Sequence, residues 1–595
     1  MKLTVHNSAT EARPVMHGSF RPHRLHSIIL VLIVSLGLMI CAGCGSGGGS
    51  TNGRPTPTPT PVATPTPVAT PTPSPTPVPP TSLSSAAAAR FLDHATFGPT
   101  AADINHVQQL DGAHPGFGMS DYMTEQMDST KTPLSTWPDV PNPLPANSPC
   151  PNFPLGCVQQ RWFQNALQGS DQLRQRSAFT LSQVWVISGI TINIAPAYNP
   201  YLRLLNADAF ATYDQVMKDV TLSPAMGWYL DMANSAKAAS GAIANENYAR
   251  EFMQLFTLGT VLLNDDGTPQ LDGQGNTIPT YSQATIQEFA RAFTGWTYKN
   301  CCAASQTFPT GTNQADWTTS MVSVDVHHDA GAKTLLNGQV LPAGQTTQQD
   351  LDAALANVFA HPNLPPFVSK QLIQHLVTSN PSPAYVARVS AVFKNNGAGT
   401  RGDLKAVLRA ILLDPEARQG DIAESPVSFG HLREPVLLIT GVLRGLGFTV
   451  NDPNAFANGL PAAGNRMGQN VLFSPSVFNY FPPDYTIPGT TLVGPEFAIQ
   501  TTSTTLARAN WIDSVIRNSL TGQGITMDFS PFRGLSPDQL TDQLNAKFMH
   551  SQMSTDMRNA IINMLSHLPA SSDPDAQART AIYLVLSSSQ YQIIH

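Results

Sequence analysis

One stretch of the chain is dense in residues that could exchange a proton. The segment NENYAREFMQLFTLG, residues 245–259, holds Glu246, Asn247, Arg250 and Glu251 within six positions. At about 100° per residue on an α-helix, these four side chains share one face. Two carboxylates beside an arginine are suited to general acid and base roles, and Asn247 is suited to binding a substrate. The alternative is an ion-pair network that joins packed helices.

The opposite face of the same helix is apolar and predicts a stripe that faces the core. Asn245 is a suitable N-cap at its start, and Gly259 supplies a left-handed stop at its end. The side chains expected in the core are Tyr248, Phe252, Leu255 and Phe256. The whole segment is therefore predicted to form one amphipathic α-helix.

A second predicted helix, SQATIQEFARAFTGW, again combines an acid with an arginine. Glu288 and Arg291 lie three positions apart on its polar side, so Glu288 is a further candidate acid or base. Trp296 follows this helix, and two interpretations are open. Its ring lines a pocket for a sugar or peptide substrate, or it packs against the helix end.

The best metal candidate follows an alternating segment, MVSVDV, that predicts a short strand. Neighbouring side chains on a strand point to opposite faces, so only one of two adjacent histidines would join a given site. The predicted ligands are His328 and Asp329, with a third from Glu246, Glu251 or Glu288. The alternative is a hydrogen-bonded turn that includes Lys333.

A glycine-rich segment after residue 260 contains several acidic side chains that suggest turns rather than a calcium site. It lacks the spacing and the final glutamate of an EF-hand. The residues concerned are Asp265, Asp266, Asp272 and Asn276. Since the chain also has no P-loop, dinucleotide fingerprint or G-x-S-x-G motif, the cofactor is unknown from the sequence.

Helical periodicity dominates the chain that must position these candidates. Four successive helices are predicted at 351–360, 366–378, 383–395 and 403–413, most of them bounded by Pro, Gly or Asp. The expected β-structure is a hairpin or ordered loop after residue 260 and the strand before His328. The predicted fold class is mainly α, with one large multi-helix domain over residues 83–595 and small β-hairpin and strand excursions.

The N-terminal residues 1–43 are typical of a lipoprotein-type signal peptide. Arg21 and Arg24 precede an apolar run, residues 28–40, that is short for a membrane span. Small residues before Cys44 predict that its thiol is lipidated and anchors the mature chain in a membrane, with ordinary secretion or a retained anchor as alternatives. Residues 44–82 are Gly/Ser-rich and then Pro/Thr-rich, and predict a disordered linker whose proline-rich part extends roughly 80 Å.

Composition argues against a nucleic-acid partner. Only 12% of the 595 residues are charged, and removal of residues 1–43 would move the net charge from −7 to −10. An acidic chain is repelled by a phosphate backbone. Export also permits disulfides, and Cys150 and Cys157 are expected to close a short proline-rich loop, with a crossed pairing to Cys301 or Cys302 as the alternative.

A set of motifs along the chain identifies a family resemblance. They run in order from about residue 87 to 592 and include RFLDHATFGPT, LRQRSAFTLSQVWVIS, NENYAREFMQLFTLG, EFARAFTGWTY, HHDAGAKTLLNG and LFSPSVFNYFPPDY. Together they resemble the bacterial family called domain of unknown function 1800. The resemblance implies export and a helical fold, and it implies no activity. Members often accompany a second secreted family that resembles sulfatases or phosphatases, and His94 departs from the Gln of many relatives.

These observations lead to three functional hypotheses. In the first, the protein is an exported, lipid-anchored cell-envelope hydrolase or transferase that acts on an extracytoplasmic polymer through Glu246, Arg250 and Glu251. In the second, it is a non-catalytic scaffold or partner of a secreted sulfatase-like protein. The third is a metal-dependent oxidative enzyme.

Overall fold

The computed structural model describes residues 82–141, 155–238, 243–300, 308, 315–421, 426, 428–452, 454–457 and 459–595. These residues belong to one compact unit, Pro77–His595. The signal segment, Cys44, nearly all of the linker and Cys150 lie outside the described residues. Cys157 takes part in a disulfide, and its pairing with Cys150 stays a prediction.

The predicted mainly α fold class is confirmed, with 22 α-helices in the described part of the chain. The first half contains α1 (Ser85–Ala95), α2 (Ala101–Ala113), α3 (Gly118–Met127), α4 (Gly156–Gln168), α5 (Gln172–Val184), α6 (Ala195–Asp208), α7 (Tyr213–Thr221), α8 (Pro224–Tyr229), α9 (Asn247–Glu251) and α10 (Gln283–Ala292). The second half contains α11 (Thr347–Ala360), α12 (Leu364–Leu376), α13 (Pro383–Lys394), α14 (Leu404–Leu412), α15 (Pro415–Arg418), α16 (Pro435–Leu446), α17 (Gly459–Arg466), α18 (Thr502–Ile516), α19 (Pro537–Phe548), α20 (Thr555–Ser566), α21 (Ala576–Leu586) and α22 (Ser589–Gln592). Helices α11 to α14 match the four helices expected between residues 351 and 413.

The β-structure among the described residues consists of four two-stranded antiparallel sheets. The pairs are β1 (Trp296–Thr297) with β2 (Val322–Ser323), β3 (Lys333–Thr334) with β4 (Val340–Leu341), β5 (His431–Leu432) with β8 (Ile593–Ile594), and β6 (Phe448–Val450) with β7 (Ile525–Met527). The β5–β8 pair brings the C-terminal end of the chain beside the start of α16. The segment after residue 260 forms isolated bridges rather than a regular hairpin.

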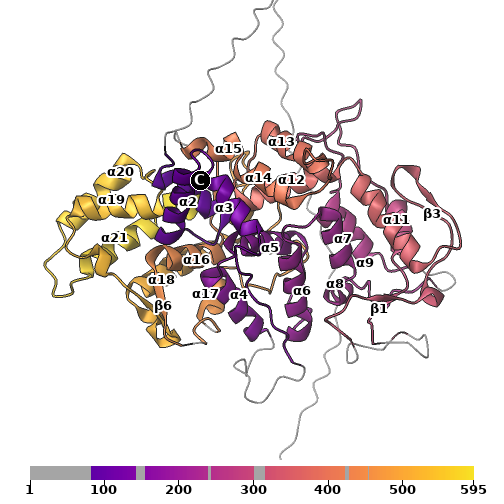
Figure 1. Cartoon of the computed structure of the whole chain (residues 1–595), viewed down its shortest axis with the longest axis horizontal. Coiled ribbons are helices and arrows are strands. Elements are labelled where there is room, and N and C mark those ends of the chain that lie inside the picture. The colour runs from indigo at the N-terminus through magenta and orange to yellow at the C-terminus, as the bar shows by residue number, and fades with distance from the viewer. Residues whose placement is uncertain are drawn as a thin grey trace, which may run out of the picture. The chain divides into compact units, whose positions relative to one another are not determined.

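Helix α5 is the central element of the core. It packs against α1, α3, α4, α6 and α12, and it lies in the middle of the view in Figure 1. Every residue of α5 except Ser182 is buried, so this helix is not amphipathic. Its N-cap is Asp171, whose carboxylate is fully buried and accepts from the Gln175 side chain at 2.9 Å.

The NENYAREFMQLFTLG segment departs from the predicted single α-helix. Helix α9 has only five residues and continues as a π-helix, η1 (Phe252–Thr257). The N-cap position is taken by Glu246, while the Asn245 side chain accepts from the Asn247 N–H at 2.9 Å in a turn. The predicted core contacts of Phe252 and Phe256 are confirmed by their complete burial. Gly259 has the expected left-handed backbone, with φ of 73°.

Within the described residues, no helix is both long and apolar enough to cross a bilayer.

Candidate functional site

The polar face of α9 contacts the neighbouring helix rather than a cavity. Glu246 Oε2 accepts from Arg250 Nη2 at 2.7 Å and from Gln283 Nε2 at 2.6 Å, and Arg250 also donates to the Gln283 amide oxygen at 3.2 Å. Asn247 Nδ2 donates to Asp231 at 3.2 Å on the exposed side. These contacts connect α9 to α10 and match the ion-pair network that was the alternative to a catalytic face.

Glu251 is the least satisfied member of this face. Its Oε2 is buried without a protein hydrogen-bond partner, and burial raises the pKa of its carboxyl above the usual value. Tyr229 and Tyr281 lie near it, and burial, followed by the charge of Glu251, raises the pKa of each phenol to about 12. Glu251 therefore lies near Tyr229 and Tyr281, and it does not line the cavity described below.

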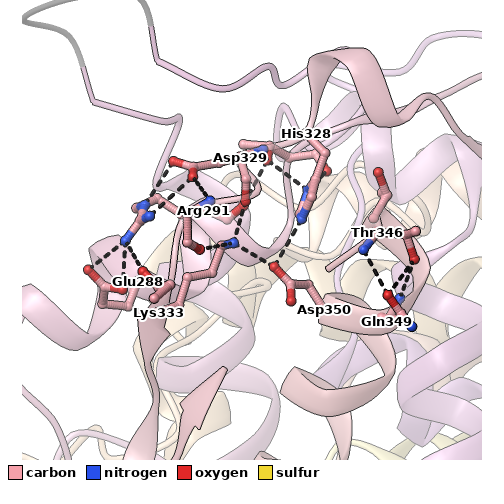
Figure 2. Close-up of polar contacts among 12 residues, drawn as sticks. Glu288, Arg291, His328, Asp329, Lys333, Thr346, Gln349 and Asp350 are labelled. Carbon is pink, nitrogen blue, oxygen red and sulfur yellow. Dashed lines mark hydrogen bonds and ion pairs between the residues drawn. The ribbon is translucent and has the colours of Figure 1, made fainter. Parts of the chain in front are cut away.

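Glu288 and Arg291 hold the loop that carries the predicted metal ligands, as Figure 2 shows. Arg291 Nη1 donates to Glu288 Oε2 at 2.9 Å, and Arg291 Nε donates to Asp329 Oδ2 at 2.8 Å. The hydrogen bond from Arg291 lowers the pKa of Asp329 to about 2, against the opposing effect of burial. Both carboxylates are thus engaged in a network that attaches α10 to the segment after η2 (Asp325–His327).

His328 belongs to a buried cluster that also contains Lys333 and, from α11, Asp350. Its Nδ1 lies 2.9 Å from the Thr294 carbonyl oxygen, and its Nε2 lies 2.9 Å from Asp350 Oδ2. Lys333 Nζ approaches the same Asp350 oxygen at 2.5 Å (Figure 2). Since both ring nitrogens have protein partners, His328 could bind a metal only by giving up one of them. Among the described residues, no group of three or more His, Cys, Asp or Glu side chains has the geometry of a metal site.

Trp296 is placed in the interior by the β1–β2 pairing. Its side chain is only 2% exposed, and its register partner on β2 is Ser323. This position matches packing near the helix end rather than the wall of an open pocket.

A cavity of about 420 Å³ lies elsewhere, where α5, η1, α12 and residues 477–496 converge. Its volume falls in the range of small-molecule sites. A second depression of about 430 Å³ lies over α13 and α14, but it is shallow, and the charged pair on its edge, Arg388 and Asp414, is joined by hydrogen bonds of 2.7 Å. The cavity at α5 is therefore the stronger candidate site.

The second half of the NENYAREFMQLFTLG segment forms one wall of this cavity. The π-helix η1 contributes Gln254 and Leu255, and the segment then turns at Gly259. A Cβ added to Gly259 would lie 2.6 Å from Cε2 of Phe367 on α12, so only glycine permits this close approach. π-Helical turns insert one extra residue into a helix and are frequent at functional sites. The wide turn directs Gln254 and Leu255 to the cavity.

Asn363, at the start of α12, holds the backbone that follows η1. Its Nδ2 donates to the carbonyl oxygens of Leu258 and Val261 at 2.6 and 2.9 Å. Its Oδ1 accepts from the Leu263 N–H at 2.6 Å. Three hydrogen bonds from one buried amide fix this wall of the cavity against α12.

Three polar side chains from distant segments form the floor of the cavity: Gln183 of α5, His375 of α12 and Glu496 of η5 (Pro495–Ile499). Glu496 is 2% exposed, and its Oε1 lies 3.1 Å from His431 Nδ1, while its Oε2 has no protein partner. Burial, followed by the positive charge of the nearby Arg176, lowers the pKa of His375 to about 3. The His375 ring is therefore neutral at pH 7.

A buried cluster of charged residues contacts the residues of this floor. Glu434, the N-cap of α16, is fully buried, and its Oε2 accepts from Gln183 Nε2 at 2.6 Å. Burial raises the pKa of the Glu434 carboxyl, with the attraction of Arg176 opposing the shift. Arg176 is also fully buried and donates to the His375 carbonyl oxygen at 2.7 Å. Charged groups that shift each other's pKa values behind a cavity are typical of functional sites.

A comparison with protein-family models assigns the chain to a family. Residues 90–593 match the model described as "Protein of unknown function (DUF1800)". The chain belongs to the DUF1800 family. No curated protein and no solved structure matches it.

The sequence did not predict the cavity floor of this DUF1800 chain or the charged residues that contact it. Glu434 and His431 lie in the segment HLREPVLLITG, and Arg176 lies in α5. One signal was available: charged residues next to or within runs too apolar for an amphipathic helix must be buried and paired. Nothing in the sequence indicated that Glu496 would meet them.

Proposed function

We propose that this DUF1800 protein is an exported, lipid-anchored cell-envelope enzyme, a hydrolase or transferase, whose catalytic centre is the cavity floor at Glu496 and His375. The single observation that carries the proposal is the position of Glu496. This carboxylate lines the cavity with one oxygen held by His431 and the other without a protein partner. The substrate is a segment of an extracytoplasmic polymer.

The chemistry proposed for the floor is acid–base catalysis. A carboxylate fixed through one oxygen can take a proton from a water or hydroxyl, or return it, at the other oxygen. His375, neutral at pH 7, orients that water or hydroxyl through a ring nitrogen without adding a charge. Gln183, held by Glu434, fixes a second contact to the substrate. Arg176 and Glu434 act as positioning residues.

Export is supported by the N-terminal sequence. The apolar run at residues 28–40, Cys44 and the proline-rich segment that follows have the order of a lipoprotein signal, its acylation site and a spacer. A spacer of this kind would carry the catalytic domain away from the membrane and toward a polymer substrate.

The test compares Glu496→Gln with Glu288→Gln in the full-length protein. The readouts are complementation of a deletion strain, release or transfer of labelled fragments from purified envelope polymers, and the thermal unfolding midpoint. Glu496→Gln should lower turnover at least ~100-fold, the usual contribution of an acid–base group. Its unfolding midpoint should hold or rise, because the buried Glu496 Oε2 has no protein partner and its charge costs stability.

The control, Glu288→Gln, breaks a structural network and should lower the unfolding midpoint while leaving turnover per folded molecule unchanged. Full activity of Glu496→Gln would remove the catalytic proposal. Absence of turnover by the wild-type protein would leave the scaffold hypothesis, in which the chain serves a secreted sulfatase-like partner. Equal losses of stability and function in both variants would also count against a site at Glu496.

A further inference from the structure

Three residues that line the cavity each have one buried polar atom without a protein partner. These atoms are the amide oxygen Oε1 of Gln183, the carboxylate oxygen Oε2 of Glu496 and the amide nitrogen Nδ2 of Asn479. These three side chains line the cavity and are only 6%, 2% and 7% exposed. Leaving a buried polar group unpaired costs about 1–3 kcal/mol, so such groups indicate a ligand that pairs with them.

The set comprises two acceptors and one donor, and this mixture suits hydroxyl groups. A hydroxyl donates one hydrogen bond and accepts others, so neighbouring hydroxyls on one ring can donate to Gln183 and Glu496 and accept from Asn479. A carboxylate or phosphate ligand, which only accepts, would meet two acceptors and one donor on this floor. A polyol matches the floor better than an anion.

Aromatic side chains provide the second half of the recognition surface. Phe367, Phe478 and Phe481 all line the cavity. Phe478 is 45% exposed although it is a large apolar side chain. Aromatic faces in a binding site offer apolar area next to directed polar groups, the combination that a sugar ring with its C–H face and hydroxyl edge requires.

The charges around the cavity do not favour a polyanion. Lys370 and Asp484 both line it and carry opposite charges, and burial lowers the pKa of Lys370 against the attraction of Asp484. Glu496 adds a further carboxylate, and His375 is neutral at pH 7. No excess of positive charge lies at this site to hold sulfate, phosphate or uronate groups.

A peptide segment fits these walls less well. An extended peptide is usually held by hydrogen bonds to an exposed strand edge. The walls here are α5, α12 and η1, whose backbone groups are bonded within the helices, together with residues 259–267 and 477–496, in which the structure has no β-strand.

We propose that the cavity binds a neutral carbohydrate segment, with hydroxyls paired to Gln183, Asn479 and Glu496 and a sugar face packed on Phe478. This inference names the substrate class of the proposed enzyme and rests on the proposed function as far as turnover is concerned. Binding can be measured separately from turnover.

The experiment measures binding to the full-length protein by saturation-transfer NMR and calorimetry. The probes are neutral oligosaccharides of β-linked glucose and of β-linked N-acetylglucosamine, a sulfated glucose oligomer and an uncharged tetrapeptide. The variants are Phe478→Ser and Asn479→Asp, which replaces the donor by an acceptor and retains the shape of the side chain. Phe117→Ser is the matched control, because Phe117 is also an exposed phenylalanine, at 51%, and does not line the cavity.

A neutral oligosaccharide should bind the wild-type protein. Its affinity should fall about 10-fold in Phe478→Ser and in Asn479→Asp and should be unchanged in Phe117→Ser. The inference is overturned if no neutral oligosaccharide binds, if the sulfated oligomer or the tetrapeptide binds more tightly at this site, or if the two cavity variants bind as the control does. Oligosaccharide binding without Glu496-dependent turnover would refute the enzyme and leave the inference standing. Glu496-dependent turnover of a polymer that is not a carbohydrate would support the proposed enzyme and refute the carbohydrate inference.

Discussion

Replacement of Asp350 by asparagine tests whether the region around His328 is structural. Asp350 is fully buried on α11 and contacts His328 at 2.9 Å and Lys333 at 2.5 Å. Lys333 is itself 2% exposed, and its other contacts are the carbonyl oxygens of Asp329 and Gly331. Asp350→Asn therefore leaves the buried Lys333 ammonium group without its direct ion-pair partner.

The expected loss in the free energy of unfolding follows from this burial. Removing one partner of a buried ion pair costs about 3–5 kcal/mol, and the two carbonyl contacts of Lys333 place the expected loss near the lower end, about 3 kcal/mol. The matched control is Asp352→Asn on the same helix. Asp352 is 49% exposed and pairs with Lys218 at 3.1 Å on the surface, where such pairs contribute about 0–1 kcal/mol.

The pH dependence of the Asp350 effect has a definite sign. Burial opposes ionisation of Asp350, but hydrogen bonds from His328 and Lys333 outweigh it and lower the pKa below 3.8. A carboxyl whose pKa is lower in the folded state stabilises the protein above its unfolded pKa. The stabilisation is lost as the pH falls through the folded pKa. The difference between wild type and Asp350→Asn should be full at pH 7 and at pH 5, and should shrink below about pH 4.

The assay is urea-induced unfolding followed by tryptophan fluorescence and circular dichroism. Adding Lys333→Met to Asp350→Asn should recover part of the loss, because the double variant no longer buries an unpaired charge. A loss no larger than that of Asp352→Asn, or losses from the two single variants that simply add, would refute the structural role assigned to this cluster.

Two further predictions concern the cavity wall and the anchor. Gly259→Ala should destabilise the protein by about 1–3 kcal/mol and weaken ligand binding in the cavity, because the new methyl group meets Phe367 and the backbone φ is 73°. Gly275 has φ of 85° and open space around it, so Gly275→Ala should lower the free energy of unfolding only through backbone strain. Equal effects of the two variants in urea unfolding would contradict the packing argument. Cys44→Ser should move the protein from the membrane fraction to the soluble fraction and abolish labelling by a fatty-acid probe, whereas unchanged membrane association would rule out lipidation at Cys44 as the anchor.

The helices of the middle region could be predicted because their signals are local. Thr346, Ser382 and Asp403 each accept a backbone N–H within the first turn of α11, α13 and α14. Caps and apolar periodicity depend on residues that are only a few positions apart, so they can be recognised in one dimension. The mainly α fold class and the buried side of NENYAREFMQLFTLG followed from the same signals.

The π-helix could not be predicted from that segment. An α-helical periodicity fits residues 245–259 well, so the segment itself gives no signal for the π-helical turn. Tyr248 and Phe252 both pack against Phe293 of the neighbouring segment, with ring centroids 5.4 and 5.6 Å apart. Contacts of this kind depend on which helices meet.

By itself, the sequence determined that this chain is a helical DUF1800 protein with acid–arginine pairs on two helices. Periodicity, caps and motifs depend only on residues that are close together in the sequence. The tertiary structure decided which of its polar groups face a cavity. Gln183, His375 and Glu496 come from segments more than a hundred residues apart. They meet because α5 is buried on all sides and must be enclosed by distant helices. The spacing of residues along the chain contains no information about such an encounter, since it depends on how the whole core packs.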